Sequence, residues 1–394
     1  MDNFTFCSPT KIVFGKDSEK TIGKELKGQA QKVLIHYGSE RIIKNGLFDT
    51  ITKSLRDNGI DYTSLGGVVP NPRYSKVLEG IELAKKEHVD YVLAVGGGSV
   101  IDSSKAIALG FYYEGNDLYD LWINQVYSKL PCLPVACILT IPAAGSETSN
   151  VSVITRDTDN LKIGFSNDVM TSRLSIINPM FFTTLPKKEM ANGVCDIIMH
   201  ILERYFTNTP HNDTTNGMSV GLIKSVMLNA RILNEDITNY DAWAEIGLAG
   251  TFAHNNLVGI GKKQDWATHK MEHELSAIYD ISHGAGLAIL FPHWLRYVYR
   301  SNISVSLSFS IDIMGVDPSG KTDDEIVLEG IEKIRGFFDM LGLPKTLSDV
   351  GIDDKNIRLM AEKATHINFG SPIKLGNFKK LDTEDLIRIY TSAL

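Results

Sequence analysis

Short apolar runs alternate with helix-like patterns through the first half of the chain, and this alternation constrains the fold more than any other feature. The apolar runs lie at residues 32–38, 61–69, 90–95 and 132–142. One intervening segment, 73–89, has an apolar helical face formed by Val77, Leu78, Ile81 and Ala84. Because strands separated by helices pair in parallel, we predict a doubly wound, mainly parallel, Rossmann-like sheet in an N-terminal α/β domain.

The pattern changes near residue 187, after a proline and two lysines in the segment 183–189. Beyond this point the extended segments fade, and helical periodicity covers 189–206, 216–233, 265–279, 323–342 and 383–393. We therefore predict an α/β domain at residues 1–186 and an all-helical domain at residues 187–394. A cleft between two domains is a common place for a ligand, so we expect the functional site there.

The composition argues against some classes of partner. The 394 residues carry a net charge of -7 and no dense Lys/Arg block, which argues against a nucleic-acid surface. The sequence has no apolar run of the roughly 18 residues that a membrane span needs, and its first residues lack a signal-peptide pattern. The four cysteines form no CxxC pair and are predicted to be reduced thiols. We expect a soluble, cytoplasmic protein with a small-molecule partner and without nucleic-acid or membrane partners.

A glycine-rich turn, "VGGGSVID" at residues 95–102, joins the apolar run at 90–95 to a helical pattern. Glycines let a phosphate approach the backbone, and a helix N-terminus offers unpaired N–H groups to an anion. Ser99 is placed to cap the helix or to donate to an oxygen. Asp102, which we place in the first helical turn, either matches the helix dipole or fixes the loop. The spacing is not GxGxxG, so this turn alone is weak evidence of phosphate binding.

Two further segments are expected after strands of the same sheet. The loop 140–150 contains a proline, a glycine and several hydroxyl side chains. After the first apolar run the sequence continues with Gly38 and Ser39, so no acid directly follows the strand. An acid there would accept the ribose hydroxyls of NAD and repel a 2′-phosphate, and its absence favours NADP over NAD.

A cluster of histidines with one aspartate indicates a metal site. Asp196 and His200 are four residues apart in a helical segment and therefore project from one face. His269 and His273 share that spacing, and His283 follows shortly after. Carboxylate with imidazole suits Fe(II), Zn(II), Mn(II) or Co(II) and disfavours Ca²⁺ and Mg²⁺. Beside a nucleotide site, such a cation favours Lewis-acid chemistry on a substrate oxygen, with hydride transfer to or from a nicotinamide.

Five segments in one order carry a resemblance to a known family. They are "AVGGGSVIDSSKAIA", "TIPAAGSE", "NPMFFTTLPKKEMANGVCDIIMHILERY", "GTFAHNNLVGIGKKQDWATHKMEHELSAIYDISHGAGLAILFP" and "LGLPKTLSDVGI". Over essentially its whole length the chain resembles the iron-containing alcohol dehydrogenases, most of all their NADP-dependent butanol dehydrogenase and aldehyde reductase branch. The resemblance implies a metal-dependent, NADP(H)-linked interconversion of primary, butanol-like alcohols and aldehydes, with the metal as Lewis acid on the substrate oxygen. It also implies a homodimer or larger homo-oligomer.

The resemblance implies roles for individual residues. The family holds its metal, Fe(II) by preference and Zn(II) as the alternative, with one Asp and three His, which here implies Asp196, His200, His269 and His283. His273 matches a recurring histidine beside the nicotinamide, which implies a catalytic role as proton relay or substrate-positioning group. The cofactor positions implied are Gly38, Ser39, Asn71, Gly97, Gly98, Ser99, Asp102, Thr140, Ser149 and Lys162.

The chain departs from the family pattern at two of its positions. Ala144 stands in the second loop where Thr is common, which removes one possible hydrogen bond. Cys195 stands next to an implied ligand where Met or Val is more usual, and it is either a packing residue or an oxidation-sensitive one. Neither departure touches an implied ligand.

Two alternatives stay open. Dehydroquinate synthase-like lyases share the architecture and use NAD and zinc, but they need several Lys and Arg residues to hold a phosphorylated, carboxylated substrate. The residues near the histidines, such as Trp266, are mainly apolar and favour a small apolar substrate. The other alternative is a regulatory protein that binds metal and nucleotide without turnover, against which the full ligand set and the intact glycine turn argue.

Overall fold

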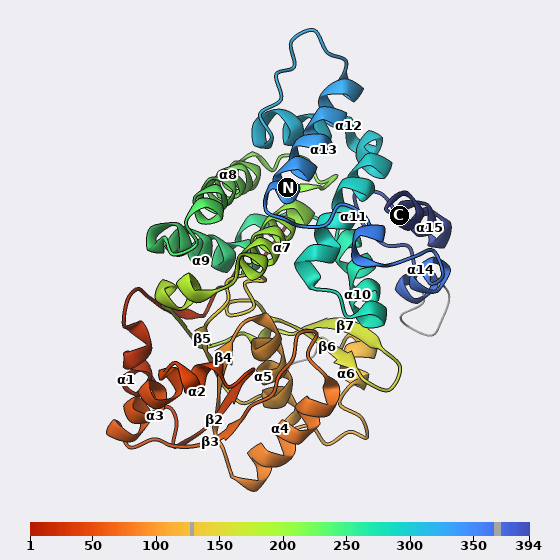
Figure 1. Cartoon of the computed structure of the whole chain (residues 1–394). Helices are drawn as coiled ribbons and strands as arrows, with labels where there is room; N and C mark the ends of the chain where they lie inside the picture. The colour runs from red at the N-terminus through yellow and green to blue at the C-terminus, as the bar shows by residue number, and fades with distance from the viewer. Residues whose placement is uncertain (127–129, 366–371) are drawn as a thin grey trace. The chain divides into compact units, whose positions relative to one another are not determined.

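The computed structural model describes residues 1–126, 130–365 and 372–394 (Figure 1). The chain forms two compact units. The α/β unit consists of Cys7–Leu185 together with Thr238–Thr251. The helical unit consists of Met1–Phe6, Pro186–Ile237 and Phe252–Leu394. Each unit therefore includes a short segment from a distant part of the sequence.

A six-stranded sheet forms the centre of the α/β unit, in the order β1-β8-β5-β4-β2-β3. Its strands are β1 (Lys11–Phe14), β2 (Lys32–Tyr37), β3 (Asp61–Leu65), β4 (Tyr91–Gly96), β5 (Val135–Leu139) and β8 (Leu174–Ile177). Every pairing in this sheet is parallel, which confirms the predicted doubly wound sheet. β4 and β5 are buried along their whole length, as expected for parallel strands covered on both faces.

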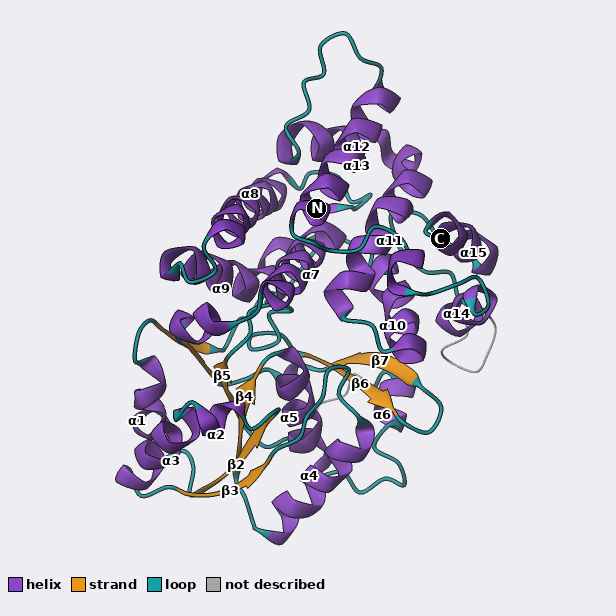
Figure 2. Cartoon of the chain, viewed as in Figure 1, coloured by secondary structure: helices purple, strands orange, loops and turns teal. Residues whose placement is uncertain are grey.

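Helices cover both faces of this sheet (Figures 1 and 2). They are α1 (Ile22–Leu26), α2 (Arg41–Lys44), α3 (Leu47–Asp57), α4 (Tyr74–Lys86) and α5 (Gly98–Gly110), whereas α6 (Asp120–Asn124) packs on strand β7 (Leu161–Ser166). The apolar residues of α1 and α3 form one core cluster with side chains from β2, β4, β5 and β8. On the other face α4 packs on α5, and α5 on β4.

The apolar face of α4 differs from the predicted one at a single residue. Val77, Ile81 and Ala84 are buried as predicted, but Leu78 is 42% exposed. A Cβ added at Gly80 would lie 2.3 Å from Ile107 Cδ1 of α5, so α4 presents its Gly80 side to that helix. Leu78 lies two residues, or about 200°, away around the helix and therefore points outward.

An antiparallel hairpin, which the sequence analysis did not predict, accompanies the parallel sheet. It is formed by β6 (Val151–Arg156) and β7 (Leu161–Ser166). The Tyr119 hydroxyl lies 3.0 Å from the Ile154 carbonyl oxygen and 2.6 Å from that of Leu161. Trp122 Nε1 donates to the Ser152 carbonyl at 2.9 Å. These bonds fix both strands of the hairpin to the segment around α6.

The second unit is mostly helical, as predicted, and Figure 2 shows that the strands gather in the other unit. Its helices are α7 (Lys187–Tyr205), α8 (Asp213–Glu235), α10 (Ala267–Tyr279), α11 (His283–Val298), α12 (Ile303–Ser308), α13 (Asp323–Met340), α14 (Ile357–Thr365) and α15 (Thr383–Ser392). One further helix, α9 (Tyr240–His254), begins in the α/β unit and ends in the helical unit. Within the described ranges no helix is both long and apolar enough to cross a membrane.

Helix α7 is the central element of the helical unit. Every residue from Met190 to Tyr205 is buried, so other segments cover the helix on all sides. It packs against α8 and α11, and α11 packs against α10. Polar side chains on α7 therefore face protein rather than water, and they need partners within the unit.

Candidate metal centre and cofactor turn

Four predicted metal ligands meet around one carboxylate oxygen. Helix α7 supplies Asp196 and His200, α10 supplies His269, and α11 begins at His283. Asp196 Oδ1 lies 3.3 Å from His200 Nε2, 3.7 Å from His269 Nε2 and 3.8 Å from His283 Nε2. Ligand atoms held about 2.1 Å from one ion in a tetrahedral arrangement are about 3.4 Å apart. The spacing of these four side chains therefore fits a shared divalent ion.

Unpaired buried atoms support the same interpretation. Asp196 Oδ1 and His269 Nε2 are buried and, among the described residues, have no hydrogen-bond partner. At 3.7 Å they are too far apart to bond each other. Leaving such atoms unpaired costs free energy, which a cation between them would offset. Asp196, His200 and His269 offer ligand atoms that all lie within 4.8 Å of one another.

Two glutamates that the sequence analysis missed orient the histidines. Glu203 Oε2 lies 2.8 Å from His269 Nδ1, and Glu203 Oε1 accepts from the His269 backbone N–H at 3.0 Å. Glu272 contacts His283 Nδ1 in the same way. A carboxylate on Nδ1 favours a proton there and leaves the Nε2 lone pair for a metal. The signal was present in the spacing, because Glu203 follows Asp196 by two helical turns.

The charges of the site favour a cation. Burial lowers the pKa of His200 to about 4, so its imidazole is neutral at neutral pH. Burial also acts to lower the pKa of His269, but Glu203 and Asp196 outweigh it and raise the value to about 9. For Asp196 burial acts to raise the pKa, yet the neighbouring histidines, led by His200, hold it well below the usual range. The site thus combines a carboxylate, a neutral imidazole and a proton-binding imidazole, and a divalent metal can take the place of the bound proton.

Aromatic and cationic side chains pack behind this cluster. The Trp266 ring lies edge-on to His269, with centroids 5.3 Å apart. Arg204 stacks over Trp266 at 4.5 Å and donates to the His200 carbonyl at 2.6 Å. Burial lowers the pKa of Arg204 to about 9. The arrangement fixes the backbone of α7 at His200 and places one aromatic ring and one buried guanidinium beside the histidines.

His273 lies beside the four ligands rather than among them. It is half-buried, and its ring centroid is 5.8 Å from that of His283. Glu272, His273 and His283 form a second group with ligand atoms within 4.8 Å of one another. Because Glu272 bonds His283 Nδ1, we interpret that pair as orienting His283 toward Asp196 rather than as a second ion site.

The predicted cofactor turn lies where β4 meets α5. Gly97 is the N-cap residue and Gly98 begins the helix. Ser99 is therefore inside the helix, and no side chain caps it, so the capping role suggested for Ser99 is wrong. A Cβ at Gly97 would lie 3.1 Å from Ile141, and a Cβ at Gly98 would lie 3.7 Å from Ala144. The second loop, residues 140–150, thus packs directly against the turn.

Asp102 holds that loop. It lies beyond the first turn of α5, contrary to the prediction, so dipole matching there does not explain it. Its carboxylate accepts from Val153 N at 2.9 Å and from the Ser146 hydroxyl. Of the other loop residues implied, Thr140 donates its backbone N–H to Gly96 O at 3.0 Å, and Ser149 is buried.

The remaining cofactor candidates form two small groups in the same unit. Gly38 and Ser39 follow β2, and a Cβ at Gly38 would lie 3.3 Å from the Val68 carbonyl oxygen. Lys162 Nζ of β7 donates to Asn71 Oδ1 at 3.0 Å, and both residues are buried. Because β2 and β4 are parallel neighbours, Gly38 and Gly97 both lie just beyond the carboxyl ends of their strands. Ligands of open α/β sheets bind beyond these carboxyl ends.

The four cysteines are free thiols, as expected. Cys195, next to Asp196, is fully buried, and burial raises its pKa well above the usual range. A protonated, enclosed thiol is inert compared with a thiolate. Of its two interpretations, packing is therefore favoured.

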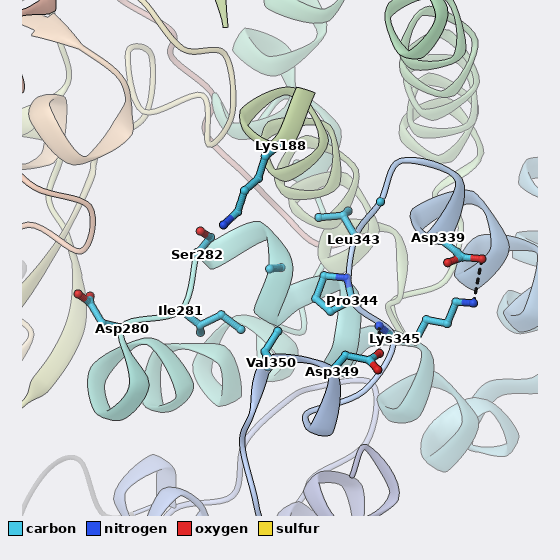
Figure 3. A pocket seen from close by; sticks show the side chains of 12 residues that line it. Lys188, Asp280, Ile281, Ser282, Asp339, Leu343, Pro344, Lys345, Asp349 and Val350 are labelled. Carbon is cyan, nitrogen blue, oxygen red and sulfur yellow. Dashed lines mark hydrogen bonds and ion pairs between the residues drawn. The ribbon is translucent and has the colours of Figure 1, made fainter. Parts of the chain in front are cut away.

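A pocket of about 700 Å³ in the helical unit lies next to the segment that leads into His283 (Figure 3). Asp280, Ile281 and Ser282 line it directly before that residue, and the Lys188 side chain points toward Ser282. Lys345 pairs with Asp339 at 2.8 Å on the opposite wall. None of the four proposed metal ligands is among the residues that line this pocket.

Comparisons with known proteins cover both units. A family model described as iron-containing alcohol dehydrogenase matches residues 9–179, and one for the C-terminal part of that family matches residues 190–394. The chain is 39% identical to a probable NADH-dependent butanol dehydrogenase 2 of Bacillus subtilis and 33% identical to the NADPH-dependent aldehyde reductase YqhD of Escherichia coli, each over 100% of both chains. The crystal structure of NADH-dependent butanol dehydrogenase A from Thermotoga maritima superposes with a TM-score of 0.95 at 40% identity, covering 100% of this chain and 99% of that one. Family models, relatives and fold agree, and the chain belongs to the iron-containing alcohol dehydrogenase family.

Proposed function

We propose that this alcohol dehydrogenase interconverts primary, butanol-like alcohols and their aldehydes, using a nicotinamide cofactor and a divalent metal. The observation that carries the proposal is the meeting of three imidazole Nε2 atoms around Asp196 Oδ1, at 3.3–3.8 Å. When bound there, a divalent ion supplies Lewis acidity toward an alcohol or carbonyl oxygen. Fe(II) is our first choice, and Zn(II) fits the same ligands.

The protein's own residues prepare this site. Glu203 and Glu272 keep the Nδ1 protons of His269 and His283 and so present both Nε2 lone pairs to the centre. Trp266 and the buried helix α7 limit access of water. His273, half-buried beside His283, is our candidate for relaying a proton or positioning the substrate.

In the α/β unit, the turn at Gly97 and Gly98 is our candidate for holding the cofactor pyrophosphate. Gly98 and Ser99 begin α5, and the N–H groups at the very start of a helix have no carbonyl partner within it, while glycine leaves room for phosphate oxygens to approach them. Thr140, Ser149, Lys162 and Asn71 are proposed to line the rest of the cofactor.

We propose NADP(H) as the preferred cofactor. No acid directly follows β2, and the exposed Arg41 lies at that end of the strand, where its Nη2 donates to the Thr184 carbonyl at 2.7 Å. A guanidinium suits a 2′-phosphate, and Ser39 adds a hydroxyl beside it. NADH is the second candidate, because the relatives at 36–39% identity are named NADH-dependent butanol dehydrogenases. The ratio of kcat/KM for NADPH and NADH decides between them.

We also propose a homodimer. β1 is an edge strand of the six-stranded sheet and pairs within the chain only with β8, among the described residues. A free strand edge can pair with a second copy. Sedimentation of the purified protein tests this, and a monomer at micromolar concentration would refute it.

The function is tested on anaerobically purified protein by metal analysis and by aldehyde reduction. We expect about one equivalent of Fe or Zn per chain, turnover of butanal with NADPH, and loss of both metal and turnover in His269→Ala. Stoichiometric metal with no turnover of any short aldehyde, but with activity on a phosphorylated sugar acid, would support the lyase alternative instead. Metal binding without any turnover would support the regulatory alternative.

A further inference from the structure

Lys105 of α5 is completely buried, an unusual place for a lysine. Its Nζ donates to three backbone carbonyls, those of Ser146 at 2.6 Å, Ser149 at 2.8 Å and Val151 at 3.0 Å. The hydroxyls of the same two serines lie at 3.3 and 3.2 Å. An ammonium has three N–H donors, and each has a carbonyl acceptor here. The contacts are therefore those of a charged lysine bound to the backbone of one loop.

Asp102, one turn earlier on α5, binds the same segment. Its carboxylate accepts from Val153 N, and its backbone carbonyl accepts from the Ser152 hydroxyl at 2.8 Å. Burial lowers the pKa of Lys105 and raises that of Asp102, while the opposite charge of each favours the ionised form of the other. Two residues on one face of α5 thus hold residues 146–153 through side-chain and backbone groups.

This connection joins the two segments that we assign to the cofactor. The N-terminus of α5 is the glycine turn, and the loop 140–150 packs on that turn through Ala144 and Ile141. Lys105 itself is too deeply buried to touch a ligand. Its effect on the cofactor must therefore pass through the loop.

We propose that Lys105 is a positioning residue, whose ammonium locks the loop 140–150 onto the glycine turn and so preorganises the nicotinamide cofactor site. The cofactor part of this inference rests on the proposed function. A loop that is already ordered adds no ordering cost when the cofactor binds. Losing the Lys105 contacts should therefore weaken the affinity for the cofactor and leave the affinity for the metal unchanged. Methionine has a similar length to lysine and lacks its donors, which makes Lys105→Met the appropriate change.

The test compares ligand-free hydrogen exchange with cofactor binding. In Lys105→Met we expect backbone amides of residues 144–153 to exchange at least about tenfold faster, and the Kd for NADPH or NADH to rise by about tenfold. The cofactor KM should rise while the aldehyde KM stays within about twofold. Ser54→Ala is the matched control, because Ser54 bonds Gly23 N and Lys20 O elsewhere in the same unit. It should lower stability without changing the loop or the cofactor Kd.

A second variant keeps the test decisive if Lys105→Met does not fold. Lys105→Gln removes the charge and leaves two of the three N–H donors, so it should raise the cofactor Kd by about two- to fivefold in the same direction. Unchanged loop exchange in ligand-free Lys105→Met, or in Lys105→Gln when the first variant does not fold, would refute the proposed anchoring of the loop by Lys105. Faster loop exchange with an unchanged cofactor Kd would refute the positioning role. A wild-type protein that binds neither NADPH nor NADH would instead refute the proposed function, and the exchange result would still stand.

Discussion

Replacing Glu203 by Gln should weaken metal binding without touching a ligand. Glu203 is buried, and its two oxygens accept from the backbone N–H and the Nδ1 of His269. A glutamine has one acceptor oxygen, so its amide N–H₂ must face one of these two donors. If it faces Nδ1, that nitrogen must become the acceptor, and the proton moves to Nε2, where it blocks the metal.

The magnitude follows from the bonds lost. A hydrogen bond to a charged group contributes about 1.5–3 kcal/mol, and changes to such outer partners of metal ligands weaken metal affinity by about 10- to 100-fold. We therefore expect the Kd for Co²⁺ or Zn²⁺ to rise by that factor in Glu203→Gln. The measurement is chelator competition on the metal-depleted protein without cofactor, followed by the Co²⁺ absorption spectrum.

Glu274→Gln is the control for this experiment. Glu274 is a buried carboxylate on the same helix as His269, and it pairs with Lys363 at 3.4 Å. Its variant should lose stability and keep the wild-type metal Kd. Equal metal Kd values for Glu203→Gln, Glu274→Gln and the wild type would refute the orienting role of Glu203.

Three further outcomes are expected. Removing the metal with a chelator should lower Tm by several degrees, because an ion at about 100 times its Kd stabilises the native state by about 2.7 kcal/mol; an unchanged Tm would contradict a tight site. Arg41→Ala should lower kcat/KM for NADPH by at least about tenfold and leave that for NADH nearly unchanged; equal losses would contradict recognition of a 2′-phosphate. Tyr119→Phe should cost about 1–3 kcal/mol in thermal unfolding, because the Ile154 and Leu161 carbonyls lose their donor; a variant as stable as the wild type would contradict this.

The parallel sheet was predictable because its signal is local. Strands such as β4 are buried on both faces and therefore contain almost only apolar residues, which can be recognised without knowing their neighbours. The hairpin of β6 and β7 has partly exposed residues in both strands and a polar connection. Tyr119 and Trp122 bond the carbonyls of its strands from 30 to 42 residues away along the chain. The residues of the hairpin itself therefore show only a weak strand pattern.

The exposure of Leu78 shows a different limit. Periodicity identifies the helix but not the orientation of its face when a glycine makes the close contact. Gly80 has no apolar side chain to count, yet it is the residue that faces Ile107 of α5. The apolar face inferred from large side chains was therefore too wide by one residue.

The metal centre and the cofactor turn differ in how much of each can be recognised from local sequence spacing. Helix α7 contains Asp196, His200 and Glu203 at helical spacing. The carboxylate that orients His269 therefore lies on the same face of α7 as the two ligands of that helix. Spacing alone could have identified Glu203 as a partner of the centre. No such regularity marks Lys105, which a helical pattern would place in solvent and whose acceptors lie 41 to 46 residues further along the chain. A buried charge of this kind becomes visible only when the loop that satisfies it is in place, and that dependence on a distant backbone is the physical reason why we assign it to positioning the loop.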